Sequence, residues 1–94
     1  MTAPESQQAV LPRRRDLPSR RVGGELMLRD PDAGTVHFLN PTAAAVWESC
    51  DGKTTVEECA ARLRQRFSVS AAVNLAADIQ AVLTDLVAKG LVDG

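Results

Sequence analysis

Apolar side chains recur at helical spacing in the second half of the chain. One stripe, at i, i+3, i+4, i+7 and i+11, comprises Val56, Cys59, Ala60, Leu63 and Phe67. Another comprises Leu75, Ile79, Val82, Leu83 and Leu86. A shorter apolar segment, AAAVW at residues 43–47, precedes both. The pattern predicts three helices, each with one face towards a core, and the third is expected to begin between residues 70 and 74.

Residues at the expected helix ends support this pattern. Asn40 followed by Pro41 suits the start of the first helix. An asparagine side chain accepts hydrogen bonds from the free N–H groups of the first turn, and the N–H that proline lacks would have no helical partner at this position. The segment TTVEE, residues 54–58, holds two Thr/Glu pairs with the spacing of a capping box. Gly52 and Gly90 suit the ends of the first and third helices, since glycine readily adopts the left-handed conformation.

Three short segments before residue 40 have the composition of strands: residues 17–22, 25–29 and 34–39. The turn DPDAG joins the last two into a hairpin. Pro18 assigns the first segment to a sheet edge, because proline lacks a backbone N–H. In the third strand, alternation predicts that Val36 and Phe38 face the core and that His37 faces the opposite side.

Strands grouped before helices indicate an α+β fold, with one sheet packed against three helices. The length of 94 residues fits a single domain. We expect residues 1–12 to be a flexible polar tail and residues 13–92 to be the domain. Apolar residues make up 45% of the chain but aromatic residues only 3%, so the core must be mainly aliphatic.

Composition excludes several classes of protein. The longest apolar run falls far short of the roughly 18 residues that span a membrane. The N-terminus lacks a signal-peptide pattern, so we expect a cytoplasmic protein with Cys50 and Cys59 reduced. These two cysteines lack the spacing of a zinc site, and we expect them to be buried or half-buried and to bind no metal.

Catalytic motifs are absent from the sequence. His37 is the only histidine, and no nearby nucleophile and acid complete a catalytic set with it. The glycines of VGGEL lack the spacing of a phosphate-binding loop. The scattered carboxylates have no calcium-loop spacing. We therefore expect a protein that is not an enzyme.

Nucleic-acid binding is the main alternative, because a few strands and three helices are compatible with a winged helix. Six of the eleven basic residues precede residue 30: Arg13, Arg14, Arg15, Arg20, Arg21 and Arg29. However, the expected recognition helix, about residues 73–89, carries Asp78 and Asp85, which phosphates would repel. The arginines are equally consistent with a protected strand edge or with an acidic partner.

The third strand, TVHFLN, contains no proline and runs directly into the first helix. If this strand lies at a sheet edge, its free backbone groups can accept a strand from another chain. The alternatives are an edge covered by the chain's own tail and an edge that pairs with a second copy of the chain.

The segment LMLRDPDAGTVHFLNPTAAAVWESCDGKTTVEECAARLRQRF, followed by LVAKGLV, resembles the PqqD-like family. The resemblance covers residues 13–92. Its most specific features are the LNPTA junction at 39–43, Trp47 before the Asp51–Gly52 pair, the TVEE start at 55–58 and Asp78 in the last helix.

The resemblance implies a winged-helix-like fold with a three-stranded antiparallel sheet and three helices. It further implies a non-catalytic peptide chaperone, or precursor-peptide recognition element, that carries no cofactor. Such proteins bind the leader of a ribosomally synthesised precursor as a fourth strand. They present it to a modifying enzyme, often a radical S-adenosylmethionine enzyme. The resemblance leaves open the pathway, pyrroloquinoline quinone synthesis included, and a monomer or a weak homodimer.

Carried onto this chain, the resemblance implies a peptide-binding strand that comprises Thr35, Val36, His37, Phe38 and Leu39. It implies a groove on the third helix among Leu75, Asp78, Ile79, Val82, Leu83 and Leu86. The apolar periodicity of that helix favours the core over the groove for its apolar members.

Overall fold

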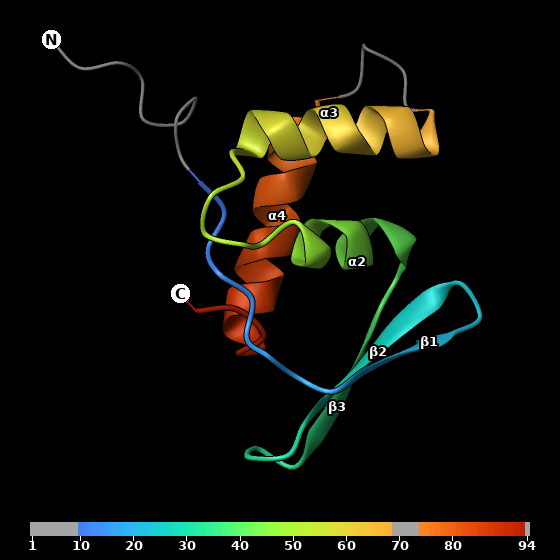
Figure 1. Cartoon of the computed structure of the whole chain (residues 1–94), viewed down its shortest axis with the longest axis vertical. Helices are drawn as coiled ribbons and strands as arrows, with labels where there is room; N and C mark the ends of the chain where they lie inside the picture. Colours follow the sequence, from blue (N-terminus) through green and yellow to red (C-terminus); the bar gives the residue numbers. More distant parts are fainter. Residues whose placement is uncertain (1–9, 69–73, 94) are drawn as a thin grey trace, which may run out of the picture.

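The computed structural model describes residues 10–68 and 74–93, and its elements follow the predicted order (Figure 1). The strands are β1 (Ser19–Val22), β2 (Glu25–Asp30) and β3 (Thr35–Leu39), and the helices are α2 (Pro41–Glu48), α3 (Val56–Phe67) and α4 (Leu75–Ala88). The strands pair antiparallel in the order β1-β2-β3. The α+β prediction, with three strands before three helices, is confirmed.

Local capping explains where the helices begin. The Asn40 side chain accepts a hydrogen bond from the backbone N–H of Ala43 at 2.8 Å, and Pro41 occupies the first helical position. Of the two possible capping boxes, the one between Thr55 and Glu58 forms, with both of its hydrogen bonds present. These starts match the sequence predictions.

The end of α2 differs from the expectation. The helix ends at Glu48, and its carboxyl-terminal cap, Ser49, keeps a right-handed conformation. Gly52, with a φ of 75°, lies in the turn that follows the helix. In this turn the Asp51 carboxylate accepts hydrogen bonds from the backbone N–H groups of Lys53 and Thr54 at 2.9 and 2.7 Å. These bonds redirect the chain towards α3.

One face of the sheet and the apolar stripes of the helices form the core. Leu26, Leu28 and Leu39 are at most 4% exposed, and the helices lie on their side of the sheet (Figure 1). The predicted helix stripes point into the same core, which is almost entirely aliphatic. Hydrophobic burial is the main force that holds such layers together.

The segment before β1 is part of the fold. Leu11 is fully buried, and its backbone N–H donates to the carbonyl of Thr54 at 2.8 Å. Val10 forms a single bridge with Thr55, and Arg14 forms one with Val92. The described fold therefore begins at Val10, three residues before the expected domain start at residue 13. The remainder of the expected tail, residues 1–9, lies outside the described residues.

Candidate functional site

The strand β3 forms one edge of the sheet, because its strand partner in the described part of the chain is β2 (Figure 1). The opposite edge, β1, is short and follows Pro18. It carries Arg20 and Arg21, and Arg21 pairs with Glu48 at 2.7 Å. Proline and charged side chains discourage strand addition. The edge at β3 has neither and is the more suitable one for a new strand.

The register shows which backbone groups of β3 face this open edge. The N–H of Arg29 donates to the carbonyl of Pro18 at 3.0 Å, on the β1 side of β2. The N–H of Arg29 is therefore directed away from β3. Because Arg29 lies opposite Val36 on β3, these two residues form a pair without mutual hydrogen bonds. Such pairs alternate with hydrogen-bonded ones along the ladder. The N–H and C=O groups of Val36 and Phe38 therefore point away from β2, towards the open edge.

The side chains of Val36 and Phe38 lie on the outer face of the sheet, where they are 50% and 52% exposed. The prediction that they face the core was wrong. The hairpin pairs Leu39 with Leu26 and His37 with Leu28, so His37 and Leu39 share the core face with these buried leucines. If the strand pairing shifted by one residue, the buried leucines would move to the solvent-exposed face of the sheet. The cost of exposing them fixes the register.

His37 is half-buried at the core face, and its Nε2 lies 3.2 Å from the Thr35 hydroxyl. Cys50 is fully buried, and its thiol donates to the carbonyl of Val46 at 3.2 Å. Burial raises the pKa of Cys50 to about 12, so this thiol stays protonated and is a poor nucleophile. Both cysteines are free and buried, as expected. This arrangement favours packing roles for His37 and for both cysteines.

The six helix residues implied as a groove divide into two groups on α4. Four are buried in the core: Leu75, Ile79, Leu83 and Leu86. Asp78 is exposed and Val82 is half-buried, so these two are the members that a ligand can reach directly. The periodicity had favoured the core, and the structure agrees for the four buried residues. The helix packs against α2 and α3.

The sequence reasoning missed the role of Arg15. Its Nη1 donates to Asp30 Oδ2 at 2.7 Å and to the carbonyl of Gly90 at 2.8 Å. The hydrogen bond from Arg15 lowers the pKa of Asp30, whose side chain is 5% exposed and also accepts from the backbone N–H of Ala33. Arg15 thus ties the amino-terminal segment to β2 and to the end of α4.

Arg14 also has an internal role. Its guanidinium donates to the carbonyl of Glu48 at 3.1 Å and lies 5.7 Å from the Trp47 ring centroid. The positive charge of Arg14 lies at the carboxyl-terminal end of α2, where it interacts favourably with the helix dipole. Two of the three consecutive arginines therefore hold the fold together. No pattern within the sequence reveals such pairings, because the partners lie 15 to 75 residues away.

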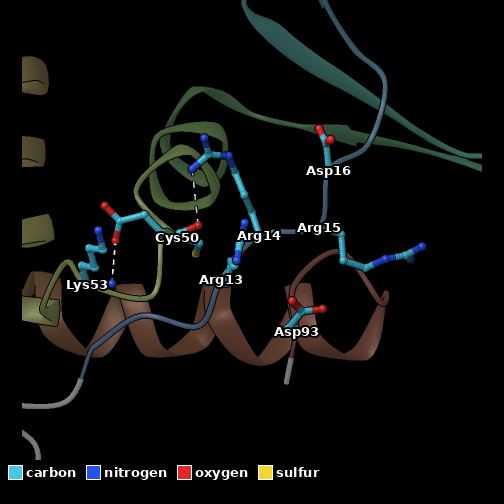
Figure 2. A pocket seen from close by; sticks show the side chains of 8 residues that line it. Arg13, Arg14, Arg15, Asp16, Cys50, Lys53 and Asp93 are labelled. Atoms are coloured by element: carbon cyan, nitrogen blue, oxygen red, sulfur yellow. Dashed lines mark hydrogen bonds between the residues drawn. The ribbon is translucent and has the colours of Figure 1, made fainter.

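An open hollow lies beside these arginines and is shown in Figure 2. It is lined by Arg13, Arg14, Arg15, Asp16, Cys50, Asp51, Lys53 and Asp93. Basic and acidic side chains are both present, and Arg14 and Arg15 are bound within the fold. The hollow is therefore not a strongly cationic site for phosphate.

The part of the chain that the structure describes contains no group of three or more His, Cys, Asp or Glu side chains placed to hold a metal ion. Among the same residues, no helix is both long and apolar enough to cross a membrane.

Comparisons with known proteins agree with this architecture. The family model described as coenzyme PQQ synthesis protein D (PqqD) matches residues 25–92, from β2 to the end of the described fold. A solved structure described as TbiB1 in complex with the TbiA(beta) leader peptide is similar, with a TM-score of 0.71 and 22% sequence identity. The match covers 87% of this chain and 95% of that chain. No curated protein matches the chain.

Proposed function

The chain belongs to the PqqD family, and from this premise we propose that it binds the leader of a ribosomally synthesised precursor peptide. The observation that carries the proposal is the open edge of β3, where Val36 and Phe38 direct their backbone hydrogen-bonding groups outwards. A leader strand added at this edge would extend the sheet to four strands. The presence of a leader peptide in the similar TbiB1 structure supports this proposal.

The implied binding strand, residues 35–39, then contributes in two ways. Val36 and Phe38 supply hydrogen bonds to the leader, whereas Thr35, His37 and Leu39 hold the strand to β2. The accessible residues of α4, Asp78 and Val82, are the candidates for contact with leader side chains. Backbone bonds thus supply general affinity and side chains supply specificity.

The chain acts as an adaptor in the cytoplasm and performs no chemistry itself. It presents the leader-bound precursor to a modifying enzyme, for which a radical S-adenosylmethionine enzyme is our candidate. Tethering gives the precursor an effective concentration of about millimolar near its enzyme when the link is short and flexible. The adaptor raises the reaction rate through proximity.

A titration of the isotopically labelled chain with the leader of a precursor encoded beside it tests the proposal. We expect the amide signals of Val36 and Phe38 to shift together with those around Val82. A scrambled leader of equal composition is the control and should leave these signals unchanged. Shifts confined to Arg13 and its neighbours would refute binding at β3.

Nucleic-acid binding is less consistent with the structure. The exposed side of α4 carries Asp78 and Asp85, and the nearby Lys89 ammonium already pairs with Asp85 at 2.9 Å. Phosphates would meet these carboxylates if the helix entered a groove. We expect no salt-dependent binding to random duplex DNA, measured by fluorescence anisotropy.

Pairing of β3 with a second copy of the chain is the alternative to leader binding at the same edge. Sedimentation equilibrium over a range of concentrations measures this directly. Our proposal predicts a monomer, or a weak dimer that the leader dissociates. A stable dimer whose association is unaffected by a bound leader would place the dimer contact away from β3.

A further inference from the structure

The outer face of the sheet is unusually apolar next to the open edge. Val36 and Phe38 are about half exposed there, and Met27 lies directly opposite Phe38 on β2. The solvent face of an antiparallel sheet is normally polar. Arg29 lies opposite Val36 on this face, and Arg20 on β1 lies opposite Met27, so arginines border the apolar group of Val36, Phe38 and Met27. Val22, the other exposed apolar residue of this face, lies on β1 opposite Glu25.

The two apolar side chains belong to the same residues that offer backbone groups to a new strand. A strand that bonds to Val36 and Phe38 places two of its own residues directly opposite them. Side chains of directly opposed residues lie on the same face of a sheet and contact each other. A bound strand therefore covers Val36 and Phe38 with its residues at positions i and i+2.

We propose that the leader carries two apolar residues, spaced i and i+2, that pack on Val36 and Phe38 outside the sheet. β-Branched and aromatic side chains fit this role, because they pair well across strands. The residue between them lies on the core face, beside His37. This inference rests on the proposed strand addition and assigns the outer apolar patch to the leader, because the patch is continuous with the edge that binds it.

Selection of peptides from a random-sequence display library against the full chain provides the test. We expect enriched peptides to carry apolar residues at i and i+2. The double variant Val36→Thr, Phe38→Thr should bind them about tenfold more weakly. Threonine keeps a high strand propensity, so the strand itself should be preserved, and urea unfolding checks this.

Val22→Thr is the matched control. Val22 is 47% exposed and also lies on the outer face, but on β1, away from the open edge. This substitution should leave peptide affinity unchanged. An equal loss of affinity in Val22→Thr would show that the whole face binds peptide and would overturn the proposed pairing.

Backbone amide shifts separate the failure of this inference from the failure of the proposed function. If bound peptides shift the amides of Val36 and Phe38 but bind the threonine double variant with equal affinity, the side-chain pairing is wrong and strand addition stands. Selected peptides with polar residues at both positions lead to the same conclusion. If no peptide is enriched, or if the shifts lie elsewhere, strand addition at β3 and this inference both fail.

Discussion

Replacement of Val36 by proline tests which backbone groups of β3 face the open edge. Proline removes a backbone N–H, and its effect depends on whether that N–H is bonded within the sheet. The N–H of Val36 points away from β2, so the substitution removes no hydrogen bond of the ladder. Its cost comes from the altered backbone angle and from the partly buried half of the valine side chain.

His37→Pro is the matched control, one residue further along. The N–H of His37 faces β2, where His37 pairs with Leu28, a fully buried residue. Loss of this bond leaves a buried carbonyl unsatisfied, which costs about 1–3 kcal/mol. The proline ring adds strain within the ladder. We expect His37→Pro to lower the free energy of unfolding by about 3 kcal/mol and Val36→Pro by about 1 kcal/mol.

Peptide binding should show the opposite order of effects in variants that remain folded. Val36→Pro removes one hydrogen bond to the added strand, a net contribution of about 0.5–1.5 kcal/mol, and its ring crowds the incoming backbone. Affinity should fall by about tenfold or more. Urea unfolding monitored by circular dichroism, with isothermal calorimetry on the same protein, measures both quantities. If Val36→Pro is as destabilising as His37→Pro, the assigned direction of these N–H groups is wrong.

Three further predictions concern stability and reactivity. Trp47→Phe should lower the free energy of unfolding in urea by about 2–4 kcal/mol, because the indole N–H donates to the buried carbonyl of Leu91 at 3.0 Å. A decrease below about 1 kcal/mol would contradict this. Hydrogen bonds, chiefly from the backbone N–H of Thr54, lower the pKa of Asp51 from 3.8 to about 2. Its stabilisation is therefore complete above about pH 4 and is lost as the pH falls towards 2, and Asp51→Asn should flatten the acid-unfolding curve over that interval. A thiol reagent should modify Cys50 and Cys59 only after urea unfolding; rapid reaction of the folded protein would show that the thiols are accessible.

Local signals in the sequence predicted the starts of α2 and α3 correctly, whereas α4 begins at Leu75, one residue beyond the expected interval, with Asn74 as its cap. Asn40 and Pro41 start α2, and Thr55 with Glu58 caps α3. These features can be predicted from the sequence because the interacting groups are at most three residues apart. Such contacts form within one turn and depend little on the rest of the fold. The end of α2 was placed too late, because Gly52 serves the following turn.

The faces of β3 were predicted wrongly for a physical reason. Val36 and Phe38 are more apolar than His37, so the local pattern favoured burying them. The hairpin register is set by Leu26 and Leu28, whose partners on β3 must share the core face. The pairing across strands decides the orientation, and a single strand does not contain that information.

The amino-terminal arginines illustrate a second limit. Arg15 contacts Asp30 and Gly90, which folding brings together from distant parts of the chain. A run of basic residues predicts positive charge, but not which side chains are used within the fold. On α4, likewise, the sequence does not separate the accessible members of the implied groove, Asp78 and Val82, from the remaining members, which are buried in the core.

Hydrogen exchange at β3 tests the central claim most directly. In the free chain, the amides of Val36 and Phe38 should exchange quickly, whereas that of His37 should be protected by its bond to β2. Addition of the leader should protect Val36 and Phe38 and leave His37 unchanged. Leader binding that protects α4 or the amino-terminal segment, with no change at Val36 and Phe38, would contradict strand addition at this edge.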